Sequence, residues 1–187
     1  MFPKKNWRQK KFDSDEGNNL KLIVNVERAR QKTFDRAVNL LTYKPRSVKE
    51  LRERLLEKEW TNGEIVEEVI EKLKGYGYLN DIQFANDFAL SKLRQKPIGK
   101  RVLKQKLTMK KLDKETIDEA VQNAFEETPE AEIIEHAVAK RLRLKGKPET
   151  REDSKKFYDY LLRQGFSYDL VSSTMREIAA RDFDEEN

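Results

Sequence analysis

The residues best suited to chemistry in this sequence are the cations of a central block that contains no acids. Between Phe88 and Leu112 there is neither Asp nor Glu, so the like charges repel one another without neutralisation. A polyanionic partner would relieve this repulsion, because ammonium and guanidinium groups bind carboxylates and phosphates. Aromatic residues are not interleaved here, which favours phosphates or an acidic protein groove over base stacking. The basic residues of the block are Lys92, Arg94, Lys96, Lys100, Arg101, Lys104, Lys106, Lys110 and Lys111.

Residues for covalent or metal chemistry are scarce by comparison. Cysteine is absent, which excludes disulfides, thiolate nucleophiles and zinc–thiolate sites. His136, the only histidine, follows Glu132 at helical spacing, but no second histidine exists to complete a metal site, so a solvated histidine beside a carboxylate is favoured. Neither a glycine-rich phosphate loop nor a nucleophile elbow occurs. The sequence therefore predicts a non-enzymatic protein with no catalytic residue, metal or cofactor.

The composition predicts helices around a thin core. Of the 187 residues, 39% are charged and 37% are hydrophobic, and only 7 Gly and 5 Pro are available for turns. Lys, Glu, Leu and Arg, which dominate between these turns, favour helices over strands. The sequence shows no apolar run near the about 20 residues of a membrane helix and no signal-peptide pattern. We therefore expect an elongated, all-α, cytosolic protein.

Helix-end chemistry locates the elements that would position the cations. In GYGYLND, Gly75 or Gly77 can end one helix in the left-handed conformation. Asn80 and Gln83 can begin the next helix as a capping box. Residues 20–26 are compatible with a short strand or with a lead into the first helix. The same criteria, with helix starts at residues such as Ser47, Thr61, Asp113 and Thr150, predict helices at about 33–43, 47–59, 62–74, 81–95, 98–110, 114–127, 129–144, 151–164 and 168–181.

The chain also repeats itself. A shift of 52 residues superimposes apolar positions, helix caps and a prolyl turn, for example Leu51 on Leu103 and Pro45 on Pro97. A further shift of 54 residues carries Leu103 onto Phe157. Such a pattern predicts three tandem three-helix repeats, each packing against the next in an elongated, curved molecule. The predicted segments are a basic, largely disordered extension at 1–32 and repeats at 33–79, 80–127 and 128–187, the last with an acidic tail.

The repeat reveals cations that recur on the middle helix of each unit. Three cations flank the core leucines of unit one, three stand at the same positions in unit two, and one remains in unit three. The simplest alternative is that these residues only solubilise a helical surface. We predict instead that they form a binding surface together with the central block and a later basic cluster. The residues added in this way are Lys49, Arg52, Arg54, Lys140, Arg141, Arg143 and Lys155.

Three stretches resemble a known family: RAVNLLTYKPRSVKELRERLLEK, IVEEVIEKLKGYGYLNDIQFANDF and IGKRVLKQKL. They are similar to the RecX family, bacterial regulators of the recombinase RecA. The resemblance is strong over residues 34 to 125 and weaker in the third unit. The sequence departs from the family at the end of the middle helix, where members often have a Lys-Gly pair. Here unit one has Lys58-Glu59, unit two has Lys110-Lys111, and Gly165 alone keeps the glycine.

The resemblance implies a function that the residues alone do not specify. Members of the family are built of three three-helix repeats, dock into the groove of RecA filaments on DNA, and usually inhibit strand exchange and ATP hydrolysis. Some also bind DNA. The resemblance thus implies a cytoplasmic bacterial regulator of homologous recombination, DNA repair and the SOS response, expected to be a monomer. Two alternatives remain: a helical protein that binds single- or double-stranded DNA directly, and a protein-interaction scaffold.

Overall fold

The computed structural model describes residues 25–185 of the chain. The predicted N-terminal extension up to residue 24, and residues 186–187 of the acidic tail, lie outside the described residues. Throughout the described range the regular structure is entirely α-helical. The helices are α1 (Val26–Tyr43), α2 (Val48–Leu56), α3 (Gly63–Gly75), α4 (Asp81–Gln95), α5 (Lys100–Thr108), α6 (Lys114–Glu127), α7 (Glu130–Lys145), α8 (Arg151–Gln164) and α9 (Tyr168–Glu185).

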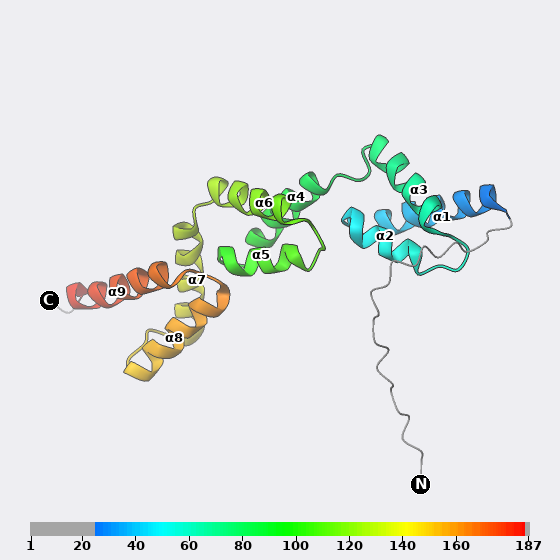
Figure 1. Cartoon of the computed structure of the whole chain (residues 1–187). Helices are drawn as coiled ribbons and strands as arrows, with labels where there is room; N and C mark the ends of the chain where they lie inside the picture. Colours follow the sequence, from blue (N-terminus) through cyan, green and yellow to red (C-terminus); the bar gives the residue numbers. More distant parts are fainter. Residues whose placement is uncertain (1–24, 186–187) are drawn as a thin grey trace, which may run out of the picture.

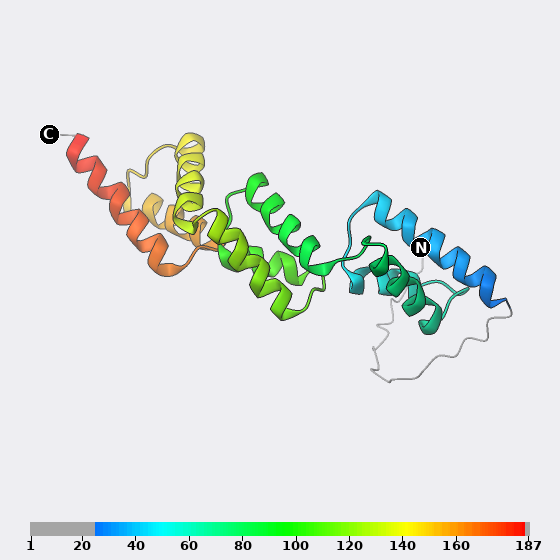
Figure 2. The same cartoon turned by 90° about the horizontal axis from the view of Figure 1, so that it is seen from above.

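The helices form three units of three that follow one another along the molecule (Figure 1). In the first unit α3 packs on α1 and α2, and in the second α6 packs on α4 and α5. In the third unit α8 packs on both α7 and α9. The view from above shows the same succession, with α1 and α9 at opposite ends (Figure 2). The prediction of an elongated, curved, all-α molecule of three tandem repeats is therefore confirmed.

Side-chain caps explain where most helices begin. Ser47, Asn80, Asp113 and Thr150 each accept a hydrogen bond from the backbone N–H three residues later, as predicted. The capping box is only half formed at α4: the Gln83 N–H donates to the Asn80 side chain, but the Gln83 side chain accepts no hydrogen bond from the Asn80 N–H and its amide donates to Asp87. No helix among the described residues is long and apolar enough to span a membrane.

Two helix starts differ from the prediction. The first helix begins at Val26, not near residue 33, because Asn25 caps it by accepting a hydrogen bond from the Arg28 N–H at 2.9 Å. Val26 is therefore helical and not in a strand. The third helix is capped by Asn62 rather than Thr61, which is buried with its hydroxyl unpaired. In both cases an asparagine side chain accepts a hydrogen bond from a backbone N–H of the first helical turn.

The apolar cores divide the molecule unequally. Eight buried residues, from Ala37 to Leu79, form a cluster inside the first unit. A second cluster of seventeen buried residues runs from Ala85 to Val171 and is shared by the second and third units. The junction between units two and three is therefore part of a continuous core, whereas the junction between units one and two is not.

Candidate functional site

The equivalent cations Arg52 and Lys104 tie each middle helix to the third helix of its own unit. Arg52 makes a two-pronged ion pair with Glu67 of α3, with Nε–Oε1 and Nη2–Oε2 distances of 2.5 and 2.8 Å. The hydrogen bond from Arg52 holds the pKa of Glu67 below its ordinary value. Lys104 pairs with Asp118 of α6. Two of the predicted contact residues thus have partners inside the fold.

Arg101 and Lys111 lie at the junctions between units. At the second junction, the Arg101 backbone N–H donates to the carbonyl of Gly165, and its guanidinium Nη2 donates to the carbonyl of Leu162 at 2.6 Å. Lys111 pairs with Glu53 across the first junction. Both cations hold neighbouring repeats together, whatever else they bind.

The remaining predicted residues are more available to a partner. Arg54 lies 3.6 Å from Glu57, and four cations lie over aromatic rings: Lys92 and Lys110 over Phe88, Lys100 over Phe125 and Arg141 over Tyr160. The others have no side-chain hydrogen bond or ion pair to any part of the chain that the structure describes. These open cations are Lys49, Arg94, Lys96, Lys106, Lys140, Arg143 and Lys155.

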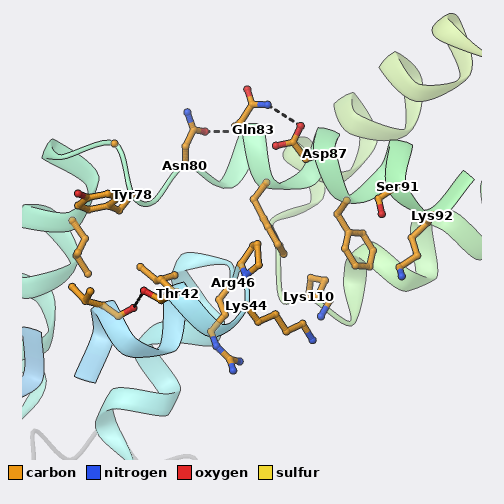
Figure 3. Close-up of a pocket in the computed structure, with 17 residues that line it drawn as sticks. Thr42, Lys44, Arg46, Tyr78, Asn80, Gln83, Asp87, Ser91, Lys92 and Lys110 are labelled. Carbon is orange, nitrogen blue, oxygen red and sulfur yellow. Dashed lines mark hydrogen bonds between the residues drawn. The ribbon is translucent and has the colours of Figure 1, made fainter. Parts of the chain in front are cut away.

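The structure brings two predicted cations together with two that the sequence analysis did not single out. Lys92 and Lys110 line a groove of about 780 Å³ between units one and two, with Lys44 and Arg46 from the turn before α2. Lys44, Lys92 and Lys110 lie along one edge and Asp87 along the other (Figure 3). Burial lowers the pKa of Lys110, and the charges of Lys44 and Arg46 lower it further.

A sequence signal for the unexpected cations exists in the repeat. The dipeptide Lys-Pro precedes the middle helix in all three units, at residues 44–45, 96–97 and 147–148. In units one and two this lysine is the C-cap of the first helix and has the same extended backbone, whereas in unit three Gly146 is the C-cap and Lys147 follows it. The closeness of Lys44 to Lys110 depends on how two units pack, and periodicity alone does not give that.

The described residues offer little for metal chemistry. Within residues 25–180, whose side chains are placed, no group of three or more His, Asp or Glu could hold a metal ion. His136 is exposed on α7. The arrangement suits charge-based and apolar contacts with another molecule.

Comparison with known families matches each unit separately. The family description "RecX, first three-helix domain" matches residues 34–73, and the second and third domains of the same family match residues 80–121 and 129–175. The three matched segments follow the order of the units along the molecule.

Curated relatives carry the name "Regulatory protein RecX". The protein from Thermotoga sp. is 37% identical over 148 residues, which cover 79% of this chain and 85% of that protein. The protein from Bacillus subtilis is 36% identical over 148 residues, which cover 79% of this chain and 55% of that protein. This chain therefore spans little more than half the length of the Bacillus relative.

Solved structures show the same fold. The crystal structure of RecX from Lactobacillus salivarius superimposes with a TM-score of 0.69 at 23% identity, over 82% of this chain and 99% of that chain. A second crystal structure, of a regulatory protein RecX, gives a TM-score of 0.67 at 24% identity, over 81% of this chain and 73% of that chain. With three successive domain matches and relatives above 30% identity, this chain belongs to the RecX family.

Proposed function

We propose that this protein binds filaments of the recombinase RecA on DNA and lowers their ATPase and strand-exchange activity, without catalysing a reaction itself. The observation that carries the proposal is the run of three consecutive RecX domains along one extended molecule. Relatives bear the name of a regulatory protein, and a molecule of successive similar units suits a partner that is itself a repeating polymer. No single deep site is required.

Open cations spread over all three units supply the contacts in this proposal. Lys49 lies on α2, Lys106 on α5 and Lys155 on α8, each without an ion pair in the described part of the chain. Arg52 and Lys104 are better assigned to the fold, because Glu67 and Asp118 already neutralise them. Many weak contacts of this kind give an affinity that falls steeply with salt.

The decisive experiment measures ATP hydrolysis by RecA on single-stranded DNA, with and without this protein, across a series of salt concentrations. We expect inhibition at low salt that weakens as the salt concentration rises, because salt screens the exposed cations. Hydrolysis that is unchanged by the protein at every salt concentration, with filaments that also fail to retain it in sedimentation, would remove RecA as the partner.

A pair of charge-reversal variants tests which surface is used. Lys49→Glu with Lys106→Glu should weaken inhibition by about tenfold or more, since two open cations become repulsive. The matched control is Arg36→Glu with Lys114→Glu, which changes the charge equally at exposed positions of the same units. Equal loss in both variants would mean that net charge alone governs binding.

Direct binding to DNA is a second candidate, favoured by the same open cations. It predicts that bare DNA and the RecA filament bind this protein with equal affinity. The proposal requires the filament to bind more tightly at the same salt concentration. Titration of labelled protein with each partner separates the two.

A further inference from the structure

The groove between units one and two has apolar walls from both units. Val38, Leu41 and Leu73 belong to the first unit, while Phe84 and Phe88 belong to α4 of the second. Phe84 and Phe88 are only partly buried, and they pack against the larger core from its edge. An apolar side chain placed between these walls would connect two cores that are separate in the free protein.

The second junction shows how the same space is closed in this fold. Ile98 stands there at the position of Arg46, one repeat later, and is buried together with Ile133 and Ala137 of α7. Ile133 and Ala137 follow the cap of α7 by the same intervals as Phe84 and Phe88 follow the cap of α4. The chain fills the second junction with its own aliphatic side chains and leaves the first one open.

The charge around the open groove is unbalanced. Lys44, Lys92 and Lys110 have no carboxylate partner among the described residues, and Asp87 on the far edge accepts a hydrogen bond from Gln83. Arg46 pairs with Glu50 on its protein side, yet its buried Nε has no hydrogen-bond partner. A ligand with several negative charges would therefore find cations along one edge, where the nearby carboxylate of Glu50 is already paired with Arg46.

We propose that this groove binds an acidic peptide segment of a partner protein, with one large apolar side chain inserted between the walls and flanking carboxylates on Lys44, Lys92 and Lys110. The inference does not depend on the identity of the filament proposed above. It follows from the combination of an apolar gap, a cationic edge and a neighbouring junction that shows what fills the gap.

A peptide fits these observations better than a nucleic acid. Base stacking needs a free aromatic face, but the ammonium groups of both Lys92 and Lys110 lie over the Phe88 ring, 5.2 and 5.4 Å from its centroid. The walls of the first unit are aliphatic except for Tyr78, whose ring packs edge-on against Tyr76, and the aliphatic part suits a Phe or Leu side chain. A groove of about 780 Å³ also accommodates more than one side chain.

The test measures fluorescence anisotropy of the labelled peptide EDEFDEDE with the full chain, without RecA or DNA. The same peptide with serine in place of phenylalanine should bind at least about tenfold more weakly, because only the first peptide buries an aromatic group. Equal affinities for the two peptides would overturn the proposal.

Two variants locate the peptide. Lys44→Gln with Lys110→Gln should weaken binding at least about tenfold. The control Lys140→Gln with Lys155→Gln, which removes the same charge outside the groove, should change it less than about twofold. Arg46→Ile with Glu50→Val reproduces the residues Ile98 and Val102 of the second junction and should abolish binding by closing the gap. Unfolding midpoints establish that each variant is folded.

Three results would contradict the inference. Equal losses in the groove variant and its control would show general attraction between charges. Stronger competition by oligothymidylate than by unlabelled peptide would assign the groove to nucleic acid. A stable dimer in sedimentation that the unlabelled peptide dissociates would assign it to a second copy of this chain.

Discussion

Lys111 adopts φ 59°, in the left-handed region, at the position where the third unit has Gly165 at φ 97°. It is the only residue other than glycine with positive φ in the described part of the chain. The conformation costs a residue with a Cβ atom about 1 to 2 kcal/mol. Lys111 thus adopts a conformation that favours glycine, while Glu59 of unit one avoids positive φ.

Replacing Lys111 by glycine should therefore stabilise the protein when the ion pair between Lys111 and Glu53 is absent from both of the proteins compared. In a Glu53→Gln background, we expect Lys111→Gly to raise the free energy of unfolding by about 1 kcal/mol. Urea denaturation followed by circular dichroism measures this. The control Lys106→Gly, inside α5, should lower it by about 1 kcal/mol. A loss of similar size at both positions would disprove strain at Lys111.

The Arg52–Glu67 pair predicts a dependence of stability on pH. Glu67 has a lowered pKa in the folded protein, so its contribution is present above the ordinary value of 4.5 and is lost as pH falls through the folded pKa. The Arg52 and Glu67 side chains are 34% and 49% exposed, so solvent screens the pair. Arg52→Gln should therefore lower the free energy of unfolding by no more than about 1 kcal/mol at neutral pH. The difference from the natural protein should shrink below pH 4.5, as urea titrations at several pH values would show. A difference that is constant with pH would exclude this pair as its source.

At the scale of the helices, local chemistry predicted most elements and left their packing undetermined. The apolar period and the caps Ser47, Asn80 and Asp113 located helices that the structure contains. The early start of α1 was missed because its first buried positions are Ala29 and Thr33, small or polar residues that give little apolar signal in the sequence. The partners of Arg52 and Lys104 lie on other helices, so no pattern along one helix could identify them.

The close approach of two glycines at the second junction is a packing feature of this kind. A Cβ atom on Gly99 would lie 2.4 Å from the backbone of Gly165, which is too close for any side chain. Gly99→Ala should therefore push α8 away from α5 and lower the free energy of unfolding by about 1 to 3 kcal/mol.

The matched control for Gly99→Ala is Gly63→Ala, where a Cβ atom meets nothing within 4 Å. Its effect in the same denaturation experiment should stay within about 0.5 kcal/mol of zero or be stabilising. Equal effects at the two glycines would show that the junction adjusts without cost.

At the scale of the whole molecule, the repeat predicted three similar units but not their unequal coupling. Arg46 and Ile98 occupy equivalent positions, as do Glu50 and Val102, and these differences accompany a first junction that is open with a charged edge and a second that is apolar and closed. Sequence shifts detect equivalence, whereas coupling depends on which side chains meet across a junction. The sequence could likewise predict which cations form the candidate surface. It could not predict which of them pair within the fold and which stay open, because that depends on contacts between helices.

The unequal cores predict that the first unit opens independently of the other two. Its cluster has eight buried residues, against seventeen in the cluster that joins units two and three. In a molecule of stacked units, the stability of each unit depends on contacts within it and with its neighbours. Backbone amides of α1 to α3 should therefore exchange with solvent at least about tenfold faster than those of α4 to α8. This ratio corresponds to an opening free energy about 1.4 kcal/mol lower. Native-state hydrogen exchange measured by mass spectrometry distinguishes the units. Gly99→Ala, which loosens the second junction, should lower the protection of amides in α7 and α8 and so reduce the difference in exchange between the first unit and the rest. Equal exchange throughout the described helices of the natural chain would instead mean that the three units open as one.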